Sequence, residues 1–376
     1  MNEDKSTRYH RHRRWAESFA LAVQAAPLIA CVGLGLSPWG VDRAREMVRF
    51  LTLPETALSV AAIFALMLAV LADVLALPAS WYRRFFLEHR YRGSRNTMVG
   101  WLVETVAAML MHTAVVAVVT TVVYLAIDLW PTRWWLASGG LFAVATVALA
   151  HVGPVVVLPA VSRVRPLTKT SLRNRLHALA RRVGVPLLGL YEWTPGVGQP
   201  YPNAALAGLG RTRRVLLTDG LLADFSDDEI EVVVAHEIAH YLHRDLWTTL
   251  VSDGLIATAV CGSAHVVVDH LRLMLGVASI GDPAALPALA LVAGLTLGAL
   301  SPGRNLILRW QERRADRDAV RMTGNAQALI SGVRRLAAQS LAEERPPRVA
   351  RWLLSTHPPF TDRVVAAALL ARGERR

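Results

Sequence analysis

Charged residues are scarce in this chain of 376 residues. They make up 19% of it, whereas a soluble globular protein carries about 25%. The mean hydropathy is accordingly positive, at +0.34, and apolar runs near 20 residues recur along the chain. Because only a bilayer requires runs of that length, the sequence predicts several membrane-spanning helices.

Cysteine and lysine are nearly absent. The two cysteines, Cys31 and Cys261, both lie in apolar runs, so they can form neither a disulfide framework nor a thiolate metal site. This excludes a small secreted scaffold and a zinc finger, and the apolar composition excludes a disordered protein. Apart from Lys5 and Lys169, all 41 cations are arginines, and they exceed the anions by 41 − 29 = 12.

Six apolar segments are expected to form membrane helices. They span residues 16–38, 56–80, 99–129, 134–161, 246–268 and 284–303. Tryptophans lie near their ends, as an interfacial aromatic belt requires. The predicted organisation is a four-helix membrane domain, a catalytic segment, two further membrane helices and a second catalytic segment. These parts cover residues 1–161, 162–245, 246–303 and 304–376.

Basic residues alternate between the loops that join these segments. Arginines crowd the N-terminal tail and residues 83–95, whereas the loops near residues 133 and 272 carry one arginine each. In membrane proteins, the arginine-rich loops are the cytoplasmic ones. We therefore expect an integral plasma-membrane protein whose N-terminus, residues 162–245 and C-terminal tail lie in the cytoplasm.

The first segment has an alternative interpretation as a signal peptide, because a basic tail precedes it. Residues 28–31 resemble a lipoprotein cleavage box, which would place a lipid on Cys31. Glu17, Gln24 and Pro27 weaken the stretch before Cys31, and the apolar run continues beyond it. A membrane helix is therefore favoured.

The motif His-Glu-Ile-Ala-His at residues 236–240 is the strongest chemical signal. Ser226 and Glu229 have the spacing of a capping box, which predicts the start of the helix that carries the motif. Histidines four residues apart lie on one helical face, so both imidazoles can bind one metal ion. Glu237 lies between them and is placed to accept the proton of a water that zinc activates.

A catalytic zinc normally has three protein ligands and one open position. No His stands six residues after His240, where an extended metzincin motif would carry one, and His243 points away from the pair. The better candidate is Glu312, with Asp316 one turn later to accept the N–H of a ligating imidazole. The alternative for both carboxylates is a charged helix surface paired with nearby arginines.

Together these motifs resemble those of the Ste24-type membrane proteases of zinc metallopeptidase family M48. That group includes the CAAX prenyl proteases and, more distantly, the HtpX-type quality-control proteases. The similarity covers approximately residues 160–370 and also includes Asn203-Ala204, the segment 217–221 and His357-Pro358-Pro359.

The resemblance implies a zinc-dependent endopeptidase that hydrolyses peptide bonds. One zinc ion per chain would be held by His236, His240 and Glu312. Glu237 would be the general base, and Asp316 would support a ligand.

On the substrate side, the resemblance implies that Asn203 and Ala204 border the cleft. His357 and Arg363 are expected near the reacting groups, as catalytic residues. One position departs from the pattern: Leu354 stands where eukaryotic members carry a further active-site His. This difference argues against full prenyl-protease chemistry and fits a shorter bacterial relative.

The predicted fold is mostly α-helical. It is a polytopic membrane protein of about six transmembrane helices, with an α+β zincin-like metallopeptidase domain that carries a small β-hairpin sheet. The sheet is expected from a strand at 187–193 and a hairpin of 203–208 with 213–218, and a helix is expected at 170–183.

The alternative function is a catalytically degenerate signal transducer or scaffold. We expect none of the external sensor domains that such transducers use, and the ligands and the base are all present. An intramembrane protease is disfavoured because residues 226–245, which hold the motif, are rich in charge. The expected partners are a peptide or protein substrate and the lipid bilayer. Nucleic acid is not expected, since the arginines of residues 173–214 lack interleaved aromatics, and no obligate partner is evident.

Six ionisable residues lie inside the apolar runs, where such groups are costly and usually face the protein interior. They are Asp73, Glu104, His112, His151, Asp253 and His265. These residues either line a water-filled chamber, as the resemblance implies, or form hydrogen bonds between helices.

Two membrane segments separate His236 from Glu312, so both residues should lie on the same side of the membrane. Reporter fusions after residues 200 and 340 should both report the cytoplasm, and a fusion at residue 278 should report the outside. Fusions at 200 and 340 that report opposite sides would make a metal site shared by His236 and Glu312 impossible.

Overall fold

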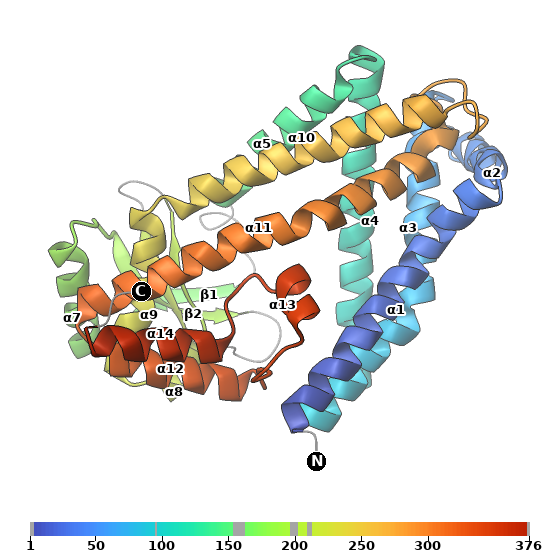
Figure 1. Cartoon of the computed structure of the whole chain (residues 1–376). Coiled ribbons are helices and arrows are strands. Elements are labelled where there is room, and N and C mark those ends of the chain that lie inside the picture. The colour runs from blue at the N-terminus through green and yellow to red at the C-terminus, as the bar shows by residue number, and fades with distance from the viewer. Residues whose placement is uncertain (1–3, 95, 153–161, 196–201, 209–212, 374–376) are drawn as a thin grey trace. The chain divides into compact units, whose positions relative to one another are not determined.

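The computed structural model describes residues 4–94, 96–152, 162–195, 202–208 and 213–373 (Figure 1). The chain divides into two compact units. The first contains Met1–Phe142 and Gly254–Leu300, and the second contains Ala143–Asp253 and Ser301–Arg376. The helices α5 (Trp134–Val152), α10 (Asp245–Leu271) and α11 (Leu286–Thr323) contribute residues to both units. The four-part organisation expected from the sequence stays a prediction.

Within the described part of the chain, five helices are long and apolar enough to cross a membrane. They are α1 (Lys5–Gly33), α3 (Ala57–Trp81), α4 (Met98–Leu129), α10 and α11. The predicted segment 134–161 corresponds to α5 (Trp134–Val152), whose apolar part, Trp134–Leu149, is shorter. Residues 153–161 lie outside the described residues. The polytopic helical class is confirmed, with an approximate helix count.

Three of these helices, α1, α3 and α4, lie side by side in the first unit (Figure 1). The amphipathic helix α2 (Ser37–Phe50) packs its buried face on α3, where Phe64 lies in the same apolar cluster. Cys31 is buried in this cluster, as expected for a small apolar residue. The cluster fixes the bend by which the chain leaves α1 and enters α3.

The basic segment after α3 has an unusual backbone. Two π-helical turns, η1 (Tyr82–Phe86) and η2 (Glu88–Arg92), continue α3, and Gly93 ends them with φ +64°. A π-turn is rare and occurs mostly as a single turn, often at functional sites. Two such turns in succession therefore mark this segment as a candidate functional region.

The rest of the first unit is a cluster around α5 and the C-terminal half of α10. A Cβ atom at Gly139 would lie 2.8 Å from the backbone of Thr258, so this close approach of the helices requires glycine. Trp134 is buried in the cluster, and its Nε1 donates a 3.1 Å hydrogen bond to His265. The short 3₁₀ helix η5 (Pro283–Ala285) then leads into α11.

The second unit contains a four-stranded sheet in the order β1-β2-β4-β3. The strands are β1 (Ser162–Pro166), β2 (Gly189–Pro195), β3 (Ala204–Ala207) and β4 (Arg214–Thr218). The central pair β2 and β4 is parallel, and both outer pairs are antiparallel. The predicted hairpin is confirmed as β3 paired with β4, which leaves β3 at an edge of the sheet.

Helices pack on this sheet around one apolar core that contains residues from β2, β4 and the helices α7, α9, α12 and α14. The helices of the unit are α7 (Thr170–Arg182), α8 (Asp219–Asp224), α9 (Asp227–Leu242), α12 (Ala326–Gln339), α13 (Arg348–Leu354) and α14 (Phe360–Ala371). The helix expected at 170–183 is thus confirmed as α7.

Most of the ionisable residues in the apolar runs bond to a neighbouring helix. Asp73 of α3 lies 2.8 Å from the ring of His112 on α4, and Asp253 of α10 forms two ion-pair contacts, 2.5 and 3.0 Å, with Arg304 of α11. Glu104 accepts a 3.3 Å bond from Asn96. Asp73, His112 and Asp253 thus bond between helices, Glu104 bonds to the segment just before its own helix, and the side chain of His151 lies outside the described residues.

Candidate metal centre

The metal motif lies on α9, whose start is fixed by the predicted capping box. The Ser226 hydroxyl accepts from Glu229 N–H, and the Glu229 carboxylate accepts from Ser226 N–H. Three acidic residues in the first turn also favour the helix dipole. One turn apart near the other end, His236 and His240 pack their rings edge to face with centroids 4.7 Å apart.

Glu312 of α11 completes a group of three donors. The Nε2 atoms of His236 and His240 lie 3.1 Å apart, and oxygens of Glu312 lie 3.6 and 3.4 Å from them. A tetrahedral zinc with ligand bonds of about 2.0–2.1 Å separates its ligand atoms by roughly 3.3 Å. The donors therefore fit one ion of that size. Among the described residues, no other set of three His, Cys, Asp or Glu side chains is grouped in this way.

Asp316, one turn after Glu312, lies behind His236. Its Oδ1 is 2.9 Å from His236 Nδ1, an ion-pair distance, although the ring does not meet hydrogen-bond geometry there. Both oxygens of Asp316 accept from Arg363 of α14, at 2.7 and 2.6 Å. Burial by itself would lower the pKa of the Arg363 guanidinium, but the charge of Asp316 raises it. Arg363 therefore acts on the site through Asp316.

His240 has an equivalent partner that the sequence reasoning missed. Its Nδ1 lies 2.8 Å from Oδ2 of Asp245, whose other oxygen accepts from Arg314. The chain reverses at Arg244, which has φ +57°, so the first residue of α10 turns back toward α9. The sequence signal for this contact is an acidic residue five positions after the second His. The contact with His240 also requires the left-handed backbone of Arg244.

The donor set is built to hold a positive charge. Burial opposes protonation of His240, but hydrogen bonds with Glu312 and Asp245 raise its pKa to about 9. Metal ligands must be deprotonated, so a bound cation takes the place of this proton. The carboxylates around the two histidines thus stabilise a positive charge there, whether a proton or a metal ion carries it.

Glu237 lies beside the donors and also contacts the edge strand β3. Burial raises the pKa of its carboxyl, while the two histidines and the backbone N–H of Leu206 oppose the shift. Glu237 lines two cavities, of about 160 and 670 Å³. Asn203 and Ala204 border the smaller cavity, and Leu206 borders the larger one.

His357 lies at the mouth of the smaller cavity. Its Nε2 is 3.6 Å from Glu312, and 65% of its side chain is exposed. Leu354 is also exposed, at the end of α13. His243, by contrast, pairs with Asp318 at 2.6 Å, as a helix-end residue outside the donor set. All the residues predicted for the site therefore lie in the second unit, around α9.

Comparison with known proteins decides the family. Residues 166–370 match the profile of Peptidase family M48, and residues 2–163 match the profile described as CAAX prenyl protease N-terminal, five membrane helices. The chain belongs to peptidase family M48. It is a membrane metalloprotease, and the degenerate transducer is not favoured.

Several known proteases are similar to the chain. The uncharacterized metalloprotease YhfN of Bacillus subtilis is 25% identical over 309 residues, which cover 80% of this chain and 71% of YhfN. CAAX prenyl protease 1 of Saccharomyces cerevisiae is 30% identical over 177 residues, 46% of this chain and 39% of that protein. A protease HtpX homolog of Nitrosomonas eutropha is 27% identical and covers 51% of this chain and 68% of the homolog.

The M48 fold is also seen in a solved structure. The crystal structure of Ste24p from S. mikatae matches with a TM-score of 0.82 and 21% identity, covering 96% of this chain and 88% of that one. This likeness confirms the fold: membrane helices combined with a small mixed sheet.

Asp245→Asn should lower metal affinity at least about 10-fold, because His240 loses the negative charge that orients and strengthens it as a ligand. The measurement is bound metal against free zinc concentration. Asp318→Asn is the matched control, since it disrupts a similar carboxylate–imidazole pair with His243 outside the donor set. Equal affinity in Asp245→Asn and the unaltered protein would contradict the role given to Asp245.

Proposed function

We propose that this M48 protease binds one zinc ion through His236, His240 and Glu312 and cuts extended peptide segments at the cytoplasmic face of the membrane. The spacing of the three donors carries the proposal, because 3.1–3.6 Å is the separation that a tetrahedral zinc requires. Glu237, next to the donors and facing the edge strand, supplies the base.

The chemistry of hydrolysis divides between the ion and the side chains. When bound, zinc supplies Lewis acidity that polarises the peptide carbonyl and makes water a better nucleophile near neutral pH. The Glu237 carboxylate takes one proton as the water oxygen bonds to the carbonyl carbon. Glu237 then gives that proton to the amine nitrogen as the C–N bond breaks. The raised pKa of its carboxyl favours this transfer in both directions.

His357 and Arg363 have different tasks in this proposal. His357 is exposed at the cavity mouth and is free to donate an N–H to the substrate oxygen on which negative charge develops. Arg363 is buried against Asp316 and holds that carboxylate beside His236, so we assign it a positioning role.

The edge strand offers the substrate a backbone to pair with. Thr218 N–H donates to the Asn203 carbonyl at 3.0 Å, which makes these two residues a hydrogen-bonded pair of the β3–β4 ladder. Such pairs alternate with pairs that do not exchange hydrogen bonds. Ala204 and Leu206 therefore direct their N–H and C=O groups to the open edge, beside Glu237. An extended peptide can add there as a further strand.

Glu237→Gln should keep zinc bound and lose at least ~10²-fold in cleavage rate, the lower range for a general base. The wild-type protein should contain one zinc per chain and lose its activity to a chelator. Metal content and cleavage of an unfolded protein substrate are the two measurements. Glu231→Gln is a control on the same helix, because Glu231 pairs with Arg175 outside the site. Active protein without zinc would overturn the proposal, as would full activity in Glu237→Gln.

Ala204→Pro should weaken peptide binding and turnover while zinc occupancy stays unchanged. The substitution removes the open-edge N–H and restricts the backbone of Asn203 before it. Ala204→Gly is the control, since it keeps the N–H. The alternative is that Asn203 only begins a turn. Normal turnover in a folded, zinc-loaded Ala204→Pro protein would favour that alternative.

A further inference from the structure

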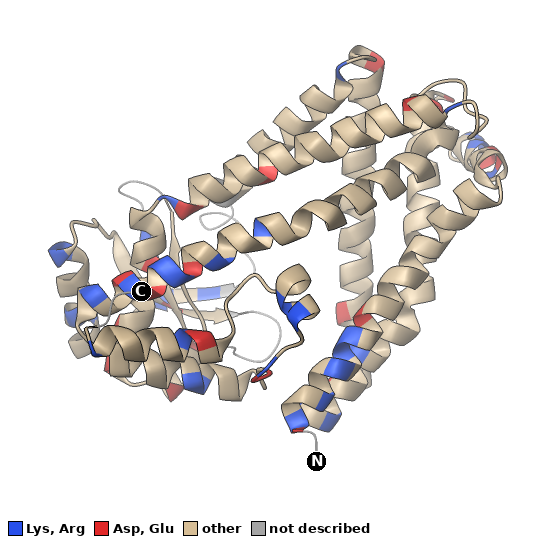
Figure 2. Cartoon of the chain, in the orientation of Figure 1, with Lys and Arg blue, Asp and Glu red and all other residues tan. Residues whose placement is uncertain are grey.

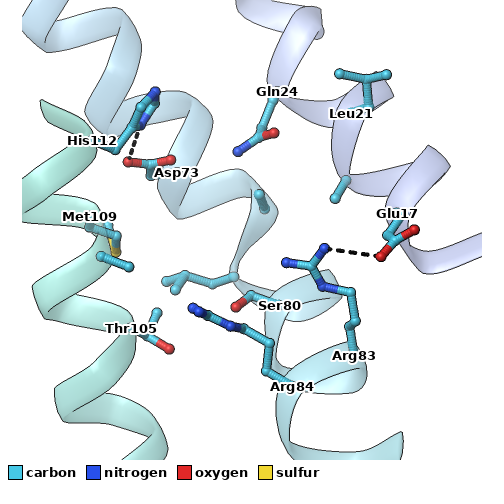
Figure 3. Close-up of a pocket in the computed structure, with 14 residues that line it drawn as sticks. Glu17, Leu21, Gln24, Asp73, Ser80, Arg83, Arg84, Thr105, Met109 and His112 are labelled. Atoms are coloured by element: carbon cyan, nitrogen blue, oxygen red, sulfur yellow. Dashed lines mark hydrogen bonds and ion pairs between the residues drawn. The ribbon is translucent and has the colours of Figure 1, made fainter. Parts of the chain in front are cut away.

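A cavity of about 490 Å³ lies among α1, α3 and α4 of the first unit (Figure 3). We call it the three-helix pocket. It is lined by Glu17, Leu21, Gln24, Asp73, Ser80, Arg83, Arg84, Thr105, Met109 and His112, together with small and apolar neighbours. The peptidase site lies in the other unit, so this pocket needs an explanation of its own.

One end of the three-helix pocket is basic and contains few hydrogen-bond acceptors for its arginine side chains. Arg83 shares Glu17 with Arg13, at 3.5 and 3.0 Å. Arg84 extends toward Thr105 in Figure 3, and among the described residues no carboxylate pairs with it. The Thr105 hydroxyl is buried without a hydrogen-bond partner, on a side chain that is only 4% exposed.

An unpartnered buried hydroxyl is costly, since leaving a buried donor or acceptor unsatisfied loses the full value of its hydration. In a helix, threonine commonly bonds to the carbonyl one turn back, but Thr105 does not. The Arg84 guanidinium offers only hydrogen-bond donors, the Thr105 hydroxyl offers a further donor, and no carboxylate of the described residues accepts from either of them. This arrangement calls for an anionic group with several oxygens.

The π-helical turn η1 explains why two successive arginines line one pocket. Neighbouring residues of an α-helix project in clearly different directions. The i→i+5 hydrogen bonds of a π-turn widen the helix, so the angle between neighbours is smaller. Arg83, which reaches Glu17 of α1, and Arg84, which extends toward Thr105 of α4, accordingly line the same pocket.

The other residues that line the pocket indicate the chemistry of the rest of the ligand. Beyond the arginines, the pocket is lined by Ala20, Leu21, Ala76, Leu77, Ala108 and Met109, which suit a hydrocarbon chain. Gln24 lies farther along and offers amide hydrogens to an ester carbonyl. Because Asp73 already pairs with His112, its carboxylate does not require a bound cation.

We propose that the three-helix pocket binds one anionic phospholipid, with its phosphate between Arg84 and Thr105 and its acyl chains against the apolar lining. The helices that form the pocket are three of the membrane-capable ones, so lipid is the solvent around them. Basic residues also gather along the N-terminal end of α1 (Figure 2), and basic clusters at a membrane surface attract anionic lipids.

The test is lipid binding by the full-length protein in neutral detergent, measured by native mass spectrometry. Phosphatidylglycerol is the probe, phosphatidylcholine is its uncharged counterpart, and inorganic phosphate is the competitor. Wild-type protein should hold one phosphatidylglycerol in preference to phosphatidylcholine. Arg84→Gln should weaken this binding about fivefold, the usual effect of one basic residue at an anionic lipid. Thr105→Val should weaken it by a similar factor, since it loses one hydrogen bond.

Arg90→Gln is the matched control, because Arg90 is exposed on the next π-turn and does not line the pocket. An equal loss in Arg90→Gln would show a general surface attraction and overturn the proposal. Equal binding of phosphatidylcholine would also overturn it, as would phosphate binding as tight as that of the lipid. If Arg84→Gln fails to fold, judged by thermal unfolding, Thr105→Val decides: unchanged phosphatidylglycerol binding there overturns the proposal.

Discussion

The ion pair between Asp316 and Arg363 is the contact on which the metal centre depends. It is buried and doubly hydrogen-bonded, and it joins α11 to α14 directly behind His236 of α9. Removing charges from water is expensive, and only good geometry with further hydrogen bonds offsets that cost. Arginine provides this geometry because its planar fork matches both carboxylate oxygens. Loss of Arg363 would leave a buried, unpaired Asp316 beside a metal ligand.

The second histidine repeats the same arrangement with different residues. Asp245 contacts His240 Nδ1 and is held by Arg314, just as Asp316 contacts His236 Nδ1 and is held by Arg363. A carboxylate hydrogen-bonded to Nδ1 of a ligating histidine keeps the proton on that nitrogen and leaves the lone pair of Nε2 for a metal ion. Both Nε2 atoms consequently face each other and Glu312. Two arginine–carboxylate pairs thus place a carboxylate beside the Nδ1 atom of each histidine.

What could be predicted from the sequence was local or periodic. The capping box at Ser226, the histidine pair and the spacing of Glu312 and Asp316 depend on helix geometry alone, and all three features are seen in α9 and α11. Asp245 could not be predicted, because its contact depends on the left-handed backbone of Arg244. The π-turns that bring Arg83 and Arg84 into one pocket are likewise invisible to a pattern based on α-helical periods. The weakest membrane prediction was the segment at 134–161, of which the described apolar helix is short.

The membrane helices α10 and α11 are part of the metal centre as well as its anchor. The hairpin begins at Asp245, which orients His240, and α11 returns with Glu312. Arg304 of α11 and Asp253 of α10 pair about two turns further into the hairpin, which holds the two helices in register. A shift of one helix by a single turn, about 5.4 Å, would separate Glu312 from the histidines or Asp245 from His240. The register of α10 against α11 therefore decides whether the three candidate donors and Asp245 come together.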